Sequence, residues 1–153
     1  MNIIIRQETE KDYEISETVV EKAFKNEVHS DHKEQLLVAK LRKSNVFVPE
    51  LSLVAEINEE IVGHIMFTKL LVKDGEIKYG SLALAPVSVL PEYQNKGVNA
   101  LLFSDLIPVY QKLGFIFAES NPELEMNGKV QAQWEYFKTE QHKRRRAFTK
   151  KID

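Results

Sequence analysis

A chain of 153 residues is long enough to bury one sizeable core and short for two, so we expect a single domain over residues 1–153. Its composition, 43% apolar and 29% charged, is ordinary for a globular protein, and the lack of cysteine excludes disulfides, thiol catalysis and zinc–thiolate sites. We find neither a signal peptide nor an apolar run of membrane-spanning length, and therefore expect a cytoplasmic protein with no membrane partner.

The net charge of −2 is distributed unevenly along the chain. Residues 138–153 carry +5, which leaves −7 on residues 1–137. A basic segment on an acidic body can bind nucleic acid. Phe148 is the only aromatic side chain in the basic segment, however, and the arginines alternate as on a strand. The pattern favours a solvated strand face over a nucleic-acid partner.

The first part of the chain predicts a strand followed by two helices. Residues 2–6 contain three isoleucines, which is typical of a buried strand. Thr9 and Asp12 form a variant of the capping box, and the helical spacing of the apolar residues that follow predicts a helix over residues 10–25. Asp31 marks the start of a second helix.

His29 and His32 lie three positions apart, a spacing that suits a pair of metal ligands on one helix. They flank a helix start instead, and no third ligand is evident. We therefore interpret them as surface histidines and expect no metal.

Three strands joined by tight turns should come next. Residues 51–57 and 61–72 form a hairpin signal around Asn58-Glu59, and a turn at residues 73–76 leads into a strand that ends at Val89. The order of two helices and three antiparallel strands predicts a mixed α+β fold.

His64 falls in the second of these strands. The simpler interpretation is a half-buried strand histidine. The functional interpretation is a general base, or a group that orients a substrate.

Pro86 lies in what should be a central strand, although proline removes a donor from the ladder. Its position fits a strand that forms a bulge there or that has lost a neighbour.

After this strand, the sequence suggests an anion-binding turn. A short apolar strand runs into a turn, and Gly97 opens a helix whose first N–H groups have no helical acceptor. A phosphate or pyrophosphate suits such a position, and a plain turn is the alternative.

The run Leu84–Gly97 resembles the acetyl-CoA-binding strand and loop of the GNAT N-acetyltransferase superfamily. That loop has the form Gln/Arg-x-x-Gly-x-Gly/Ala, which Gln94, Lys96 and Gly97 match, whereas Asn99 stands where Gly or Ala is usual. The resemblance implies cofactor contacts by the following residues: Val87, Ser88, Val89, Gln94, Asn95, Lys96, Gly97, Val98, Asn99 and Asn127.

The resemblance also implies an α+β fold in α/β/α layers, with a mostly antiparallel sheet of about six strands, splayed after the fourth, and about four helices. Residues 1–97 resemble one small bacterial subgroup, and residues 98–153 a second GNAT-like subgroup. The splay would explain Pro86.

Beyond the loop we predict a helix over residues 98–111, which Pro108 should kink or end near Leu106–Ile107. Residues 115–120 should form the fifth strand, and Asn127 should cap another helix. Residues 143–152 read as a sixth, edge strand, through which the chain could form a homodimer.

The resemblance implies direct attack of an amine acceptor on acetyl-CoA, without an acyl-enzyme. Glu119 and His64 are the candidates for the base. Trp134 stands where relatives commonly carry the tyrosine that protonates the thiolate, and Tyr136 and Tyr110 are candidate substitutes. We predict an acetyl-CoA-dependent N-acetyltransferase; the alternative is an acyl-CoA-binding sensor or catalytically weak relative.

Overall fold

The computed structural model describes residues 2–28, 30–115 and Glu135. The chain divides into two units, residues 1–116 and 117–153, and the elements below belong to the first. Its four strands form one antiparallel sheet in the order β1-β2-β3-β4. They are β1 (Ile4–Gln7), β2 (Phe47–Ile57), β3 (Glu60–Asp74) and β4 (Ile77–Val89). No helix in the described part of the chain is long and apolar enough to cross a membrane.

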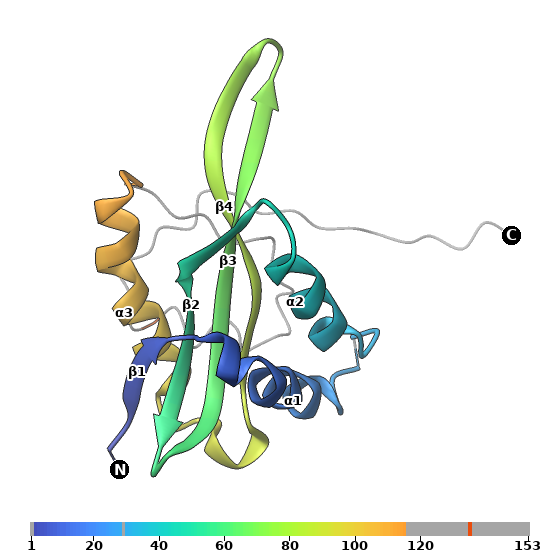
Figure 1. The fold of residues 1–153 in the computed structure, drawn as a ribbon, viewed down its shortest axis with the longest axis vertical. Coiled ribbons are helices and arrows are strands. Elements are labelled where there is room, and N and C mark those ends of the chain that lie inside the picture. The colour runs from blue at the N-terminus through green and yellow to red at the C-terminus, as the bar shows by residue number, and fades with distance from the viewer. Residues whose placement is uncertain (1, 29, 116–134, 136–153) are drawn as a thin grey trace, which may run out of the picture. The chain divides into compact units, whose positions relative to one another are not determined.

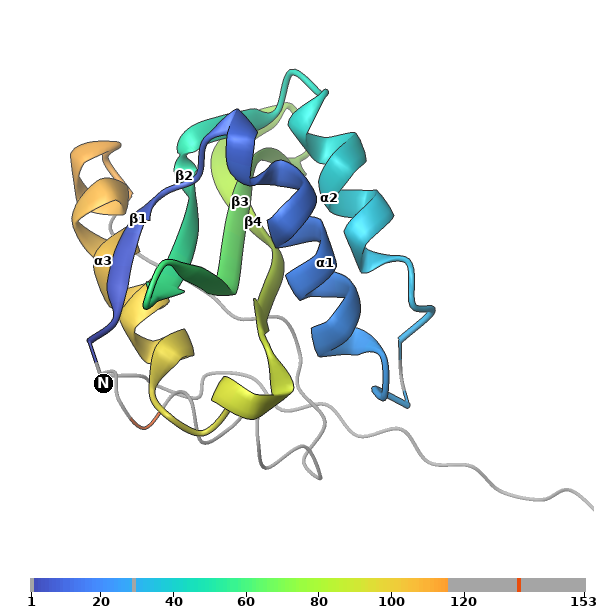
Figure 2. The ribbon, with the colours of Figure 1, turned by 60° about the horizontal axis from the view of Figure 1, so that its bottom comes forward.

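Helices cover both faces of this sheet (Figures 1 and 2). A 3₁₀ turn, η1 (Glu10–Asp12), leads into α1 (Tyr13–Phe24), which lies beside α2 (Glu34–Arg42) on one face. A second 3₁₀ turn, η2 (Pro91–Tyr93), follows β4 and precedes α3 (Val98–Lys112) on the opposite face. This arrangement confirms the predicted α/β/α layers. The fifth and sixth predicted strands and the fourth helix fall outside the described residues.

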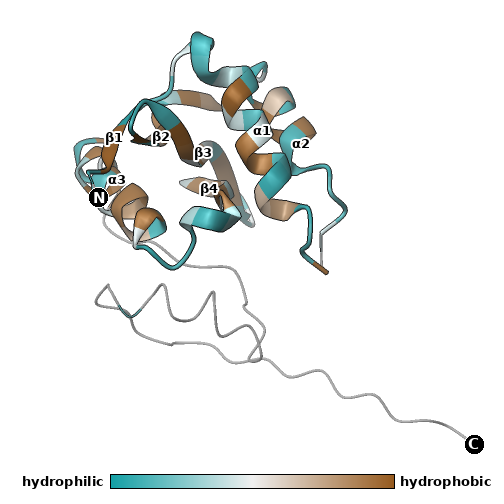
Figure 3. Cartoon of the chain, turned by 90° about the horizontal axis from the view of Figure 1, so that it is seen from below, coloured by the Kyte–Doolittle hydropathy of each residue, from teal (hydrophilic) through white to brown (hydrophobic). Residues whose placement is uncertain are grey.

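The core on the α1–α2 face is built around one apolar side chain from each of α1, α2 and β3. Val20 of α1, Val38 of α2 and Met66 of β3 are fully buried against one another. Figure 3 shows apolar residues along β2 and β3 between the helices, and hydrophilic residues in the connecting loops. The burial of these side chains, at about 1.5–3 kcal/mol each, explains why the helices dock on the sheet.

On the other face, Gly63 lets α3 approach the sheet closely. A Cβ atom at this position would lie 3.1 Å from Val98 Cγ1 and 3.4 Å from Leu102 Cδ1 of α3, and 3.2 Å from Ala55 Cβ of β2. The missing side chain therefore sets the distance between α3 and β3, and with it the position of the helix N-terminus.

The turns form as the sequence predicts. Asn58 and Glu59 both have positive φ, 49° and 68°, as a two-residue type I′ hairpin between β2 and β3 requires. Gly75 (φ 57°) starts the two-residue turn between β3 and β4. Near the first helix, Asp12 Oδ2 accepts the Thr9 N–H at 2.8 Å, which confirms the predicted capping contact.

Pro86 lies in a β-bulge. Ile65 pairs with Val87 and Phe67 pairs with Leu84, so Ala85 and Pro86 of β4 face a single residue of β3. The bulge accommodates the proline without the loss of a regular ladder bond, which is one of the two explanations that the sequence offered.

The predicted helix over residues 98–111 is confirmed to within one residue, and of the two outcomes predicted at Pro108, a kink or an end, the end near Leu106–Ile107 is wrong. Helix α3 continues to Lys112, and its C-terminus forms at Gly114 (φ 84°), where the N–H of Phe115 donates to Tyr110 O and that of Gly114 to Gln111 O. These two bonds make a Schellman motif. Ser104, whose carbonyl loses its helical partner at Pro108, is an exposed residue.

The outer half of the β3–β4 hairpin forms an arm, which we define as residues 69–82. It extends beyond the other strands at the top of Figure 1, and every residue from 69 to 80 is exposed. Because β4 ends at Val89, the arm and the loop that follows β4 lie at opposite ends of the strand.

Candidate functional site

The segment from Val89 to Ala100 joins a strand to a helix in the way an anion site requires. Strand β4 ends at Val89, η2 follows, and Asn95 (φ 59°) and Gly97 (φ 80°) then turn the chain into α3. A Cβ atom on Gly97 would meet no atom of the described residues within 4 Å. Space beside the backbone is therefore open at the point where α3 begins.

The first turn of α3 offers free donors to that space. Its first backbone hydrogen bond runs from Leu101 N–H to Gly97 O, at 3.1 Å. The N–H groups of Val98, Asn99 and Ala100 have no acceptor among the described residues. The dipole of a 15-residue helix adds partial positive charge at this end, so an anion is the natural ligand.

The side chains of Gln94 and Tyr93 tie the loop to the sheet, and Lys96 adds a positive charge to it. Gln94 Nε2 donates to the carbonyl of Val89 at 3.1 Å, which ties the loop to the end of β4. Lys96 Nζ lies 5.2 Å from the centre of the Tyr93 ring, and the Tyr93 hydroxyl donates to Glu60 at 3.2 Å. The nearby Glu60 carboxylate raises the pKa of Tyr93, which therefore keeps its proton. Lys96 thus places a cation on the loop.

The end of β4 also presents a backbone donor at its open edge. Leu90 N–H donates to Val62 O at 2.9 Å, and N–H directions alternate along an antiparallel strand. The Val89 N–H therefore points away from β3, toward the edge of β4 that has no neighbour among the described strands. The predicted cofactor residues Val87–Val89 and Gln94–Asn99 thus share one continuous strand, loop and helix start.

His64 is buried more deeply than the half-buried histidine that the strand pattern suggested. It is fully buried on the α1–α2 face of β3, and it pairs in register with Ser88 of β4. Its Nε2 atom lies 3.6 Å from Glu8 Oε1 and 3.4 Å from Ser52 Oγ. Its Nδ1 atom has no hydrogen-bond partner among the described residues.

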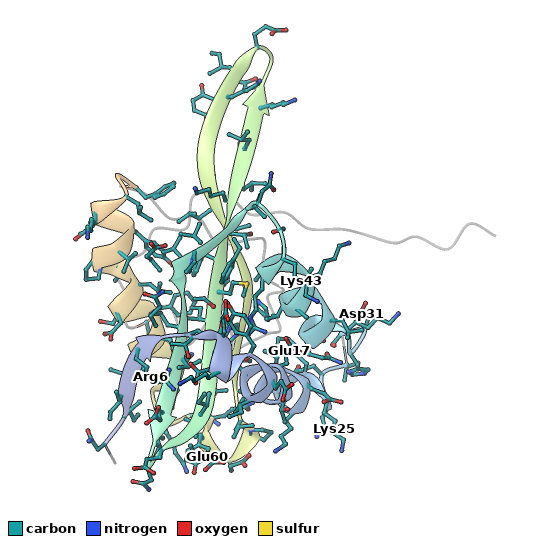
Figure 4. The ribbon with its side chains drawn as sticks, viewed as in Figure 1. Arg6, Glu17, Lys25, Asp31, Lys43 and Glu60 are labelled. Atoms are coloured by element: carbon teal, nitrogen blue, oxygen red, sulfur yellow. The ribbon has the colours of Figure 1, made fainter. Side chains whose placement is uncertain are left out.

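Glu8 connects His64 to the helices and was missed by sequence reasoning. Its Oε1 accepts from Ser16 Oγ at 2.5 Å and from Arg42 Nη2 at 2.6 Å, and its Oε2 accepts from Ser52 Oγ at 2.7 Å. Arg42 also contacts Glu17 Oε1 at 2.6 Å, and Figure 4 labels Glu17 on α1. We call Glu8, Ser16, Arg42, Ser52 and His64 the buried polar cluster.

The pKa of Glu8 reflects this environment. Burial alone would raise the pKa of the carboxyl, but the imidazole of His64 and the hydroxyls of Ser16 and Ser52 outweigh it and lower the pKa to about 2. Glu8 is therefore ionised at neutral pH. No local sequence signal could have found the cluster, because its members come from separate elements of the chain.

Of the remaining sequence candidates, the structure describes Tyr110 and His32. Tyr110 of α3 packs edge-on against Phe67, with ring centres 5.2 Å apart, and its buried hydroxyl has no partner among the described residues. Burial raises the pKa of Tyr110. His32 Nδ1 lies 3.0 Å from the Phe24 carbonyl oxygen. The other candidates lie outside the described residues: His29, Glu119, Asn127, Trp134 and Tyr136.

Comparison with known proteins settles the family. Residues 5–126 match the Acetyltransferase (GNAT) family. The chain belongs to this family. A crystal structure of a GNAT family acetyltransferase from Brucella melitensis, in complex with acetyl-CoA, is 34% identical in sequence, with a TM-score of 0.67 over 74% of this chain and 71% of that one. The resemblance that the loop sequence indicated is thereby confirmed.

Two further relatives extend the comparison. The uncharacterized N-acetyltransferase YjhQ of Escherichia coli (strain K12) is 44% identical over 71 residues, and the match spans 46% of this chain but only 39% of that protein. The structure of AAC(6')-Iy, in complex with the bisubstrate analog CoA-S-monomethyl-acetylneamine, has a TM-score of 0.71 at 16% identity, over 99% of this chain and 100% of that one. The latter likeness concerns the fold alone.

Proposed function

We propose that this GNAT protein is an acetyl-CoA-dependent N-acetyltransferase that moves the acetyl group directly to an amine. The observation that carries the proposal is the junction of β4 and α3, where an outward-facing strand N–H, a left-handed glycine and free helical N–H groups follow one another. Family membership and the acetyl-CoA bound by the Brucella melitensis relative support the choice of donor.

In the proposed complex, the pyrophosphate of acetyl-CoA lies on the N–H groups of Val98 and Asn99, where the helix dipole and Lys96 add positive charge. The thioester lies along Val87–Val89, and the Val89 N–H donates to its carbonyl oxygen. The amine nitrogen attacks the carbonyl carbon, so that a C–N bond forms and the C–S bond breaks. The nitrogen loses one proton, and the departing thiolate takes one up.

Binding is tested by thermal unfolding with acetyl-CoA, with CoA, and with ADP as the nucleotide control. Acetyl-CoA and CoA should both stabilise the chain, by about 2.7 kcal/mol at a concentration of a hundred times Kd. ADP should stabilise it much less. The absence of a shift with either CoA species would contradict the proposal.

Gly97 offers a matched pair of variants for the loop. Gly97→Leu places a side chain in the open space beside the α3 N-terminus, and should abolish the acetyl-CoA shift. Gly75→Leu, on the arm, likewise places a side chain at a positive φ, 57° against 80° at Gly97, where a Cβ atom also meets no described atom within 4 Å. It should lose stability but keep the shift. A Gly97→Leu chain that still binds acetyl-CoA would exclude this loop as the phosphate site.

Turnover is tested by thiol release from acetyl-CoA over three acceptor classes: neamine, spermidine and a lysine-containing peptide. Neamine is included because its acetylated form is part of the analog bound by the structural neighbour AAC(6')-Iy. Release with one class identifies the acceptor. Binding of acetyl-CoA without release in any class would favour the acyl-CoA sensor.

A further inference from the structure

The buried polar cluster lies next to the proposed acetyl-CoA strand, yet the binding of acetyl-CoA makes no use of it. The side chains of Glu8, Arg42 and His64 are 0%, 3% and 0% exposed. They come from the β1–η1 connection, α2 and β3, and they meet between the sheet and the two helices that cover it. A buried group of this kind is costly to desolvate and calls for a reason beyond packing.

The hydrogen bonds around His64 define which ring nitrogen carries its proton. Ser52 donates its single hydroxyl hydrogen to Glu8 Oε2, so toward His64 Nε2 the hydroxyl can only accept. Glu8 Oε1, the other neighbour of Nε2, is an ionised acceptor. Nε2 must therefore hold the hydrogen of the neutral imidazole. The basic lone pair is left on Nδ1, which has no partner among the described residues.

The charged groups around His64 carry a net negative charge. The charged groups in the cluster and its immediate contacts are Glu8, Glu17 of α1 and Arg42 of α2, which sum to −1. Tyr13 of α1 packs its ring against the Arg42 guanidinium at 4.3 Å, and burial raises its pKa, so it stays neutral. Toward His64, β2 and β4 contribute the hydroxyls of Ser52 and Ser88. An imidazolium at His64 would bring the buried charge to zero.

His64 is also placed beside the strand on which the proposed transfer occurs. It pairs directly with Ser88, and side chains of directly paired residues lie on the same face of a sheet. The next residue, Val89, carries the backbone N–H that faces the open edge of β4. His64 is thus one strand away from the proposed position of the thioester.

We propose that Nδ1 of His64 receives the proton that the attacking amine loses, and that Glu8 is the positioning residue that fixes the ring and stabilises its charged form. This inference rests on the proposed function. Because His64 is fully buried, a water molecule carries the proton from the amine nitrogen to Nδ1. The C–N bond forms as the C–S bond breaks, and the imidazolium returns its proton through solvent to the thiolate, so the cluster is unchanged after each cycle.

The tautomer can be tested without turnover, by ¹⁵N NMR of the histidine rings in the full chain. His64→Gln assigns the signal among the four histidines. We expect the neutral form with hydrogen on Nε2. A neutral ring with its hydrogen on Nδ1 would overturn the proposal.

Kinetics test the role in transfer, with the acceptor class that releases thiol in the screen. His64→Gln should lower kcat/KM by a factor of about 10²–10⁴ while the acetyl-CoA thermal shift persists. Glu8→Gln should move the acid limb of the kcat/KM profile to lower pH. If Glu8→Gln does not fold, Glu8→Asp keeps the charge and should lower kcat while the limb stays in place.

The control is Glu56→Gln on β2, whose carboxylate accepts from Arg6 Nε at 2.9 Å and is not part of the cluster. It should leave the pH profile unchanged. If the wild type is active and His64→Gln keeps kcat/KM within about threefold of it, the role of His64 is refuted but the proposed function is not. A wild type that acetyl-CoA does not stabilise would instead refute the proposed function.

Discussion

Glu8 has the lowest exposure and the densest set of polar partners among the carboxylates of the described residues. Arg42 and the hydroxyls of Ser16 and Ser52 satisfy its two oxygens, so that a charge which would be expensive to bury alone is retained between the sheet and α1–α2. The same contacts join β1, β2, α1 and α2 at one point. The ionisation of this single residue should therefore be linked to the stability of the whole first unit.

We predict that the chain loses stability as the pH falls from about 4.5 toward 2. The folded-state pKa of Glu8, about 2, is below its ordinary value of 4.5, so over this interval the unfolded state binds more protons than the folded state. The stabilisation is complete above pH 4.5 and should fall by an amount on the order of 3 kcal/mol as the pH drops through this range. The measurement is urea unfolding at pH 7, 4.5 and 3.

Glu8→Gln should show a shallower dependence on pH, because the titrating group is absent. Some dependence should persist, since hydrogen bonds from Arg6 hold the pKa of Asp12 low as well. Glu60→Gln, at an exposed position, is the control and should follow the wild type. Equal slopes in Glu8→Gln and wild type would show that another group governs acid unfolding.

At the scale of the elements, the contact between α3 and β3 sets the position of the α3 N-terminus, whose N–H groups are the proposed phosphate donors. We predict that Gly63→Ala lowers the free energy of unfolding by about 1–3 kcal/mol, because its Cβ would press on Val98 and Leu102. Combining it with Val98→Ala should restore part of the loss. Urea unfolding measures both effects.

Gly80→Ala is the matched control, since a Cβ at that strand position would meet nothing within 4 Å. It should change stability by less than about 0.5 kcal/mol. If Gly63→Ala were equally harmless, α3 would be free to shift on the sheet. Its N-terminus would then not be held at a fixed position beside β4.

The elements also show what local sequence patterns can predict. The strands and the two tight turns were predicted from residue pattern, because Asn58-Glu59 and Gly75 meet demands that lie within a few residues, but β2 begins at Phe47 and not at residue 51. The bounds of the helix over residues 98–111 were predicted to within one residue, but the end that was one of two outcomes expected at Pro108 does not form, since the rule considers only the lost bond at the proline. The Schellman motif at Gly114 and the exposure of Ser104 decide the outcome instead.

For the molecule as a whole, the same distinction separates the two parts of the candidate site. The loop Gln94–Asn99 is continuous in the chain, so its pattern could be recognised from sequence. The buried polar cluster joins residues as far apart as Glu8 and His64, and only the register of β2, β3 and β4 with the docked helices brings them together. His64 was a candidate from sequence, but its contact with Glu8 could not be predicted.

In the first unit, the arm and the proposed acetyl-CoA loop lie at opposite ends of β4 (Figure 1). We predict that a shortened arm keeps both stability and ligand binding. Removing Leu71–Asp74 and Ile77–Gly80 joins Leu70 and Ser81 through the existing Gly75-Glu76 turn. Directly paired residues of an antiparallel ladder alternate between hydrogen-bonded and non-hydrogen-bonded pairs. The pair Leu70↔Ser81 lies four residues along the ladder from Asp74↔Ile77, so it is of the same kind and can close a two-residue turn.

The free energy of unfolding should change by less than about 0.5 kcal/mol, since every deleted residue is exposed, and the acetyl-CoA thermal shift should equal that of the full chain. Removing three residues from each strand, Val72–Asp74 and Ile77–Tyr79, is the matched control. It places Leu71↔Gly80 at the turn, where the pair is of the other kind and closes a two-residue turn poorly. This control should be less stable than the four-residue deletion, although it removes less of the arm. A four-residue deletion that folds but no longer responds to acetyl-CoA would show that the arm takes part in binding.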